Sequence, residues 1–265
     1  MESLPTEILN IIVRSLQDDD KISLGLTSTR LLDVVTYNLN EDVMAQGSAR
    51  YGSLDVIQHM VQCGYQPGIT TLNHMFVEAA LCGSLEYLKY VHYCIAYNHM
   101  VQISTITFRE AITTAIRRDR LECLKYLMEN IKKMSIKEMF TASMVNGAIK
   151  CFDHLVQFVK DPVSLIYDSL EVMVKKSNID LIKHIHTIFN LPIDRLSLFA
   201  ARYGRLDCLR YSLPLFKLCV GFSRKSVELW MEAKANGHKT TVRYLKQNGC
   251  RTMNHKLKPR LLFRM

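Results

Sequence analysis

A six-residue pattern that recurs seven times constrains the fold of this chain more than any other feature. Each copy begins with a small or turn-forming residue, which is followed by any residue and then by Leu or Ile (Lys in the last copy). The fourth residue is usually an acid, and the last two are mostly apolar. The copies begin at Gly52, Gly83, Asp119, Gly147, Ser177, Gly204 and Gly237. Successive starts are 31, 36, 28, 30, 27 and 33 residues apart, which is typical of stacked repeats. Such arrays bury a core between units and usually work as binding surfaces.

Each repeat is predicted to be a pair of helices. After the small residue of the sixth copy, Leu206, Leu209 and Leu213 follow at i, i+3 and i+7, which places them on one helix face. The small residue, often Gly, suits the left-handed conformation at the end of the preceding helix. The acid falls in the first turn of the second helix, where the helix dipole favours it. The unit is therefore a helix-turn-helix pair of roughly 30 residues.

These units resemble ankyrin repeats, which carry an Ala-Ala before a Gly-containing turn and a Leu-Glu-like start to the second helix. Residues 79–86 (AALCGSLE) and 200–207 (AARYGRLD) match that pattern best. The resemblance covers about residues 43–250. The family's Thr-Pro-Leu-His opening is missing and most connecting loops are short, so we expect a nearly all-helical stack without projecting β-hairpins. Degenerate repeats of this kind are similar to those encoded by giant DNA viruses.

The first forty residues do not fit the repeat and predict three short helices. Pro5 suits the first turn of the first helix, and Ile8, Leu9, Ile12 and Leu16 form its apolar stripe. The acidic run Asp18–Asp20 is expected to break that helix, with Asp20 capping the second. The second helix is expected to end near Thr27, and a third to begin at about Thr29.

This stretch resembles an F-box, whose pattern begins Leu-Pro-x-Glu-Leu/Ile-Leu and ends in Ser/Cys-Lys/Thr-Arg. Lys21 and Leu31 depart from it, since the family usually has an apolar and an aromatic residue there. The resemblance implies that this module binds the adaptor of an SCF-type cullin-RING ubiquitin ligase. The implied adaptor-binding residues are Leu4, Pro5, Ile8, Leu9, Ile12, Leu16, Ile22, Leu24 and Leu26. The alternative is a helical cap that shields the first repeat.

Composition and charge favour an intracellular binding protein. The net charge of +9 comes from the last 33 residues, because residues 1–232 hold equal numbers of basic and acidic residues. That distribution argues against a nucleic-acid interface on the repeats. No apolar run is long enough to span a membrane, and Met1–Pro5 lack the features of a signal peptide. The expected compartment is the cytoplasm, that of the host if the protein is viral, with the nucleus as the alternative.

No catalytic, cofactor or metal site is predicted. The nucleotide-binding, zinc-protease and nucleophile-elbow motifs are missing, and His184 and His186 are two apart, so they face different ways on a helix. Cys123, Cys151 and Cys208 share one repeat position and are interpreted as reduced core thiols. Tyrosines on the second helices are assigned to packing, with target contact as the alternative. Trp230 is expected in the core.

The predicted architecture is all-α, with an F-box-like module at 1–40, about seven ankyrin-like repeats at 41–250 and a basic tail at 251–265. The tail has three possible roles: a disordered end, a cap formed by Leu261, Leu262 and Phe263, or a basic segment for nuclear import or phosphate binding. The predicted function is non-catalytic recruitment of a target protein to the ligase, by a chain that is monomeric outside that complex. The alternative is a scaffold or decoy that recruits no ligase.

Overall fold

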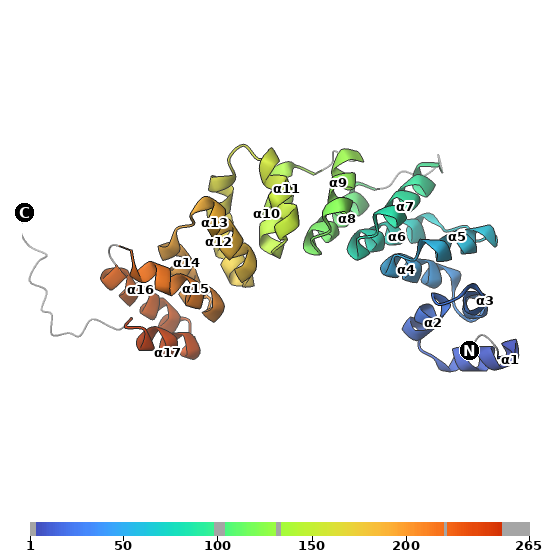
Figure 1. Ribbon diagram of the computed structural model, residues 1–265, viewed down its shortest axis with the longest axis horizontal. Helices are drawn as coiled ribbons and strands as arrows, with labels where there is room; N and C mark the ends of the chain where they lie inside the picture. Colours follow the sequence, from blue (N-terminus) through green and yellow to red (C-terminus); the bar gives the residue numbers. More distant parts are fainter. Residues whose placement is uncertain (1–3, 98–103, 131–133, 220–221, 251–265) are drawn as a thin grey trace, which may run out of the picture. The chain divides into compact units, whose positions relative to one another are not determined.

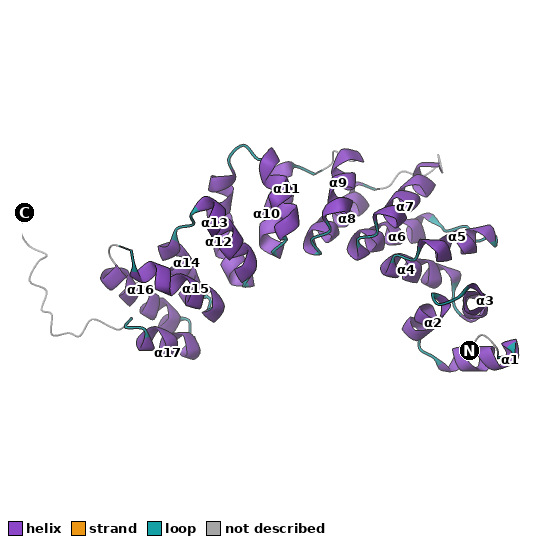
Figure 2. Ribbon diagram, in the orientation of Figure 1, coloured by secondary structure: helices purple, strands orange, loops and turns teal. Residues whose placement is uncertain are grey.

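The computed structural model describes residues 4–97, 104–130, 134–219 and 222–250. Over these ranges the chain forms seventeen α-helices and one short 3-10 helix, and no strand occurs in them (Figure 2). The all-helical fold class is therefore confirmed. The 251–265 tail lies outside the described residues.

Three helices come first, followed by seven helical hairpins (Figure 1). The first three are α1 (Thr6–Ser15), α2 (Asp18–Gly25) and α3 (Thr29–Asn38). The first three hairpins are α4 (Glu41–Tyr51) with α5 (Leu54–Gln62), α6 (Ile69–Cys82) with α7 (Leu85–Tyr97), and α8 (Thr105–Arg117) with α9 (Leu121–Asn130). The fourth is α10 (Ile136–Asn146) with α11 (Ile149–Leu155), followed by the 3-10 helix Val156–Phe158. The last three are α12 (Pro162–Lys176) with α13 (Ile179–Phe189), α14 (Ile193–Arg202) with α15 (Leu206–Lys217), and α16 (Phe222–Ala235) with α17 (Lys239–Gln247).

The helices form two compact units. The first contains Met1–Ala142 and Asp153–Leu155, and the second contains Ser143–Phe152 and Val156–Met265. In the first unit the leading helices of successive hairpins, α4, α6 and α8, pack in a row. In the second unit α12, α14 and α16 do the same. Each unit is thus a stack of hairpins, as the repeat pattern predicts.

The first residue of all seven sequence copies adopts the left-handed conformation. Their φ angles lie between 54° and 90°, and the second helix of each hairpin begins two residues later. Five of them are glycines. Asp119 and Ser177 take this conformation despite carrying a side chain, and only Asn190 joins them among the described non-glycine residues. The predicted repeat register is therefore confirmed at every copy.

The N-terminal helices pack as one small bundle on the first hairpin. Helix α3 contacts α1 and α2, and α2 and α3 in turn contact α4 and α5. Ser28 caps α3 by accepting a hydrogen bond from the Leu31 backbone. The predicted role of the acidic run was wrong, because Asp18–Asp20 form the first turn of α2 and Gln17 precedes it as the N-cap. Three carboxylates at this end favour the helix by interacting with its dipole.

The cysteine position of the repeat is buried in every hairpin. Cys123, Cys151 and Cys208 are at most 1% exposed, so their assignment to the core is confirmed. The same position holds Tyr87 and Thr241, which shows that it is not always apolar. The Tyr87 hydroxyl lies 2.6 Å from Ser48 Oγ, whereas Thr241 Oγ1 is buried without a hydrogen-bond partner.

Trp230 is half-buried rather than in the core, so that prediction was wrong. Leu229 and Ala233, one turn apart, fill the buried stripe of α16 at 1% and 0% exposure. The indole consequently lies beside that stripe, with Lys234 Nζ 4.8 Å from the ring centre. Such a position suits a cation–π contact at the surface.

Candidate protein-interaction surfaces

Helix α1 has apolar residues on two faces, and only one of them is used in packing. Leu9 and Val13 are completely buried. Ile8 and Ile11, one turn apart on the other face, are 44% and 65% exposed. Pro5, just before the helix, is also exposed. These three residues, Pro5, Ile8 and Ile11, form what we call the α1 edge.

The other predicted adaptor-binding residues divide between core and surface. Leu9 and Ile22 lie in the core at 0% and 3% exposure, so they support the module from within and do not reach its surface. The half-buried residues are Leu4, Ile12, Leu16, Leu24 and Leu26. Ile11 was absent from the prediction although it is the most exposed apolar side chain of α1. Its i, i+3 spacing from Ile8 was the signal that could have identified it.

The second residue of each copy, which we call the turn residue, links neighbouring hairpins. In four copies its side chain donates to the backbone carbonyl two residues before the left-handed residue of the preceding hairpin. The pairs are Arg120 with Leu81, Asn178 with Val145, Arg205 with Lys175, and His238 with Arg202. Carbonyls at a helix C-terminus lack an intrahelical partner. The second residue of the pattern, whose type the pattern does not fix, thus provides a hydrogen-bond donor for a free carbonyl at the C-terminal end of the neighbouring helix.

Two of these turn residues pack directly over a glycine. A Cβ added at Gly83 would lie 2.6 Å from Arg120 Cδ, and one at Gly204 would lie 2.6 Å from His238 Nδ1. Both distances are too short for real contacts, so a Cβ at either position would displace its neighbour, and the positive φ of both residues favours glycine as well.

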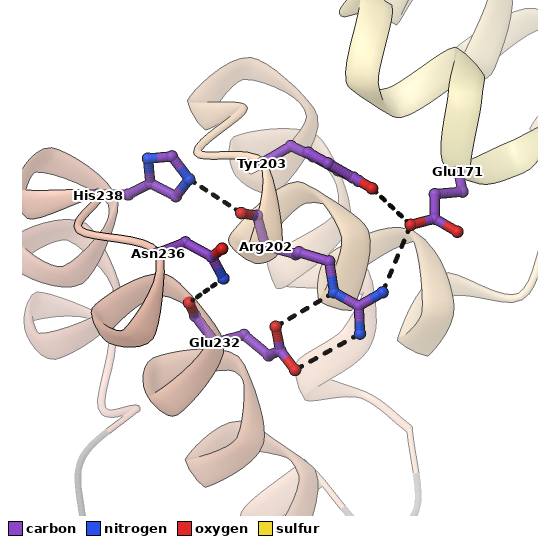
Figure 3. A network of polar contacts seen from close by, with 6 residues as sticks. All are labelled: Glu171, Arg202, Tyr203, Glu232, Asn236 and His238. Carbon is purple, nitrogen blue, oxygen red and sulfur yellow. Dashed lines mark hydrogen bonds and ion pairs between the residues drawn. The ribbon is translucent and has the colours of Figure 1, made fainter.

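Ion pairs join the leading helices across each stack. Figure 3 shows Arg202 of α14 between Glu171 of α12 and Glu232 of α16, with N–O distances of 3.4 and 3.2 Å. Tyr203 also donates to Glu171, and His238 lies 2.9 Å from the Arg202 carbonyl. In the first unit, Arg50 holds the position equivalent to Arg202. It lies 3.7 Å from both Asp19 of α2 and Glu78 of α6.

A second recurring contact connects the trailing helices. His92 Nδ1 of α7 lies 2.7 Å from the Tyr126 hydroxyl of α9, and Lys89 stands over the same ring. In the second unit His186 lies 2.6 Å from the Tyr211 hydroxyl, again with a lysine, Lys183, over the ring. Burial lowers the pKa of His92, which keeps the imidazole neutral at pH 7. The packing role predicted for the tyrosines is confirmed at these two positions.

One cluster places a thiol, an imidazole and a carboxylate close together. Cys63 Sγ lies 3.6 Å from His59 Nε2, and the same nitrogen lies 3.3 Å from Asp33 Oδ1. A nucleophile relay needs the two contacts on different ring nitrogens, so this geometry does not form one. Over the described residues no three His, Cys, Asp or Glu side chains gather in a metal-binding arrangement.

A polar pocket of about 350 Å³ opens between the leading helices α6 and α8. Its walls include Asn73, His74, Val77 and Glu78 of α6 and Thr107 and Glu110 of α8. Asn73 Oδ1 and Glu78 Oε2 are buried without a hydrogen-bond partner. Glu78 Oε2 does have Arg50 Nε at 3.7 Å, but that distance is too long for a hydrogen bond.

The two units differ in formal charge. Counted over its whole sequence, the first unit holds thirteen Lys and Arg against seventeen Asp and Glu. The second unit, counted to residue 250, holds sixteen against eight. Residues 1–250 therefore hold 29 basic against 25 acidic residues, and the surplus lies in the second unit. The basic excess begins well before the tail.

Comparison with known proteins identifies no relative. No protein-family model matches the chain, and the search of curated proteins found no match either. Across the described part of the chain, none of the helices is both long and apolar enough to cross a membrane.

Proposed function

We propose that the chain is a non-catalytic, substrate-recruiting subunit of an SCF-type cullin-RING ubiquitin ligase. The α1 edge supports this proposal most directly. Ile8 and Ile11 lie side by side in solvent while Leu9 and Val13 already fill the core below them. Adjacent exposed isoleucines on one helix are typical of a surface that a partner covers. Their positions also fall within the F-box-like stretch of the sequence.

In this proposal the protein acts by proximity. The α1 edge binds the ligase adaptor, and the hairpins hold a target protein. The tethered target then meets the ubiquitin-loaded enzyme at a high effective concentration. No side chain of this chain takes part in the chemistry, and the site of action is the cytoplasm or nucleus of a eukaryotic cell.

A second candidate is a scaffold or decoy that binds a partner and recruits no ligase. The contacts of α2 and α3 with the first hairpin favour it, together with the ion pair between Asp19 and Arg50. An N-terminal bundle that rests on the first repeat has a sufficient role as a cap, because terminal repeats need their exposed apolar face covered.

We expect replacement of Ile8 and Ile11 together by alanine to weaken adaptor binding by at least about 2 kcal/mol, or roughly thirtyfold. Both side chains are already exposed, so the fold should be unaffected. Titration calorimetry with a purified eukaryotic SCF adaptor measures the affinity, and circular dichroism follows the melting temperature. The sequence pattern predicts the same loss for Leu4→Ala combined with Pro5→Ala.

Ile106→Ala is the matched control, since Ile106 is 76% exposed on α8 of the same unit. It should leave adaptor binding unchanged. A wild-type protein without measurable adaptor binding would contradict the ligase proposal. Recovery of a target without adaptor and cullin in a pull-down from eukaryotic lysate would favour the scaffold.

A further inference from the structure

The trailing helices of the second unit carry an excess of positive charge. Helices α13, α15 and α17 hold six Lys and Arg against two Asp. The trailing helices of the first three hairpins, α5, α7 and α9, hold two Lys against four Asp and Glu. The excess is therefore a property of the second unit and not of the repeat itself. The six cations are all exposed: Lys183, Arg210, Lys217, Lys239, Arg243 and Lys246.

Three of these cations form a row across the unit. Lys183, Arg210 and Arg243 each stand six residues after the left-handed residue of their hairpin, so they occupy equivalent positions on successive trailing helices. Figure 1 shows these helices one after another, and side-chain hydrogen bonds join α13 to α15 and α15 to the C-cap of α17. Neighbouring helices pack about 10 Å apart. The basic row, as we call Lys183, Arg210 and Arg243, thus presents one cation at each such step.

Helix α17 is basic along its whole exposed stripe. Lys239, Arg243 and Lys246 follow at i, i+4 and i+7, while Thr241 and Leu245 are buried on the opposite side. The first turn of α17 contains no acid, although α13 and α15 each have an Asp there. Like charges one turn apart and a cation at a helix N-terminus both destabilise a helix. An anionic partner that covers this stripe would remove both effects.

The charges of the leading helices are paired, whereas those of the trailing helices are not. Arg202 of α14 pairs with Glu171 and Glu232. Lys225 of α16 pairs with Asp194. Over the described residues of this unit, none of the six cations on the trailing helices forms an ion pair with an Asp or Glu. Their positive charge is therefore complementary to an anionic partner.

We propose that the basic row binds an acidic segment of the target protein. Carboxylates are suitable ligands, because the guanidinium groups of Arg210 and Arg243 can each bind one through two parallel hydrogen bonds. In an extended segment, carboxylates three residues apart lie about 10 Å apart, which matches the spacing of the row. This inference rests on the proposed function in assuming a target protein. It deepens that function by assigning the target a run of acidic residues and a place on the trailing helices.

A nucleic acid fits this surface less well, because the rings beside the row are already in use. His184, Tyr211 and Tyr244 directly follow the three cations and are half-buried. The Tyr211 hydroxyl lies 2.6 Å from His186 Nδ1, and Lys183 stands over the Tyr211 ring. Proteins that bind single strands without sequence preference stack bases on free aromatic faces. The observations therefore favour a peptide.

The test uses the full chain and, as the probe, an acetylated peptide of repeated Glu-Gly-Ser units. Its carboxylates lie three residues apart. NMR titration at physiological salt should show saturable shifts confined to α13, α15 and α17. The same peptide with Gln in place of Glu should show no saturable shifts, because the charge-assisted hydrogen bonds are lost. Higher salt should weaken the Glu probe, since the cations are exposed.

The combined variant Lys183→Gln, Arg210→Gln and Arg243→Gln should bind the Glu probe at least about tenfold more weakly. The melting temperature should stay near the wild-type value, because all three side chains are exposed and form no ion pair.

A matched control removes the same charge elsewhere in the unit. Lys160→Gln, Lys176→Gln and Arg195→Gln combined change three exposed cations that lie outside the trailing helices. This variant should bind the probe within about twofold of wild type, because charges more than a Debye length away are screened. An equal loss in both triple variants would show a response to net charge alone and would overturn the proposal.

The remaining outcomes are equally decisive. The proposal is wrong if the wild-type protein does not bind the Glu probe, or if the shifts are confined to residues 251–265. Tighter binding of a deoxythymidine oligonucleotide, or of vesicles that contain phosphatidylserine, would assign the surface to a nucleic acid or a membrane instead. The Ile8→Ala and Ile11→Ala double variant should bind the probe like wild type, so that a failure of this surface and a failure of adaptor binding are distinguished.

Discussion

Replacing Cys208 by aspartate is expected to destabilise the second unit by on the order of 4 kcal/mol. Cys208 is fully buried on α15, and burial raises the pKa of its thiol to about 11. The environment that disfavours a thiolate disfavours a carboxylate in the same way. Cys208→Ala removes only a small hydrophobic group and should cost about 1 kcal/mol. Urea unfolding followed by the fluorescence of Trp230, the single tryptophan, reports on this unit.

The Cys208→Asp variant should also show a distinct pH dependence. Its new carboxyl has a folded-state pKa above the unfolded value, so the protonated form is compatible with folding and the penalty grows as pH rises. The loss in free energy of unfolding relative to wild type should therefore be smaller near pH 4 than at pH 7. Cys219→Asp is the control, because Cys219 is exposed in the same unit and its replacement should have little effect. A similar loss of stability in both variants would contradict the assignment of Cys208 to the core.

Replacing Gly204 by alanine should cost about 2–3 kcal/mol, against about 1 kcal/mol for Gly237→Ala. Both glycines have positive φ, at 66° and 74°. They differ in their surroundings: a Cβ at Gly204 meets the His238 ring, whereas one at Gly237 meets no atom within 4 Å. Only the Gly204 variant must displace the imidazole and break its contact with the Arg202 carbonyl. The difference in destabilisation between the two variants measures the free-energy cost of that close approach.

A double-mutant cycle tests the explanation. His238→Ala should make a subsequent Gly204→Ala change as mild as Gly237→Ala, because the obstructing ring is gone. Trp230 fluorescence serves again as the readout, since all three positions lie in the second unit. Equal costs for the two glycine variants in the wild-type background would show that backbone strain alone decides their effect.

The hairpins were predictable because their signals are local. The left-handed residue, the acid after it and the apolar i, i+3 spacing all act within one helix pair, so the register was correct even at Asp119 and Ser177. The acidic run was misassigned because aspartate suits both an N-cap and a first turn. Trp230 was wrongly assigned to the core because the hydrophobicity of a residue alone does not decide which face of α16 is buried.

The candidate surfaces were less predictable because they join distant residues. The turn residues follow no pattern in the sequence, since this position holds Arg, Asn or His in different copies of the repeat. Yet each donates a hydrogen bond to a backbone carbonyl that lies thirty or more positions earlier in the sequence. The α6–α8 pocket carries no motif, because its walls come from two helices. The α1 edge was found only in part, since the family resemblance did not include Ile11.

The turn residues also bear on how the protein unfolds. In a linear array, cooperativity depends on the coupling between nearest neighbours. Ala148 is the one turn residue among the seven whose side chain has no hydrogen-bonding group, and it belongs to the hairpin that is divided between the two units. At this turn the side chain therefore adds no hydrogen bond to the coupling between neighbouring hairpins, so that coupling depends on packing alone.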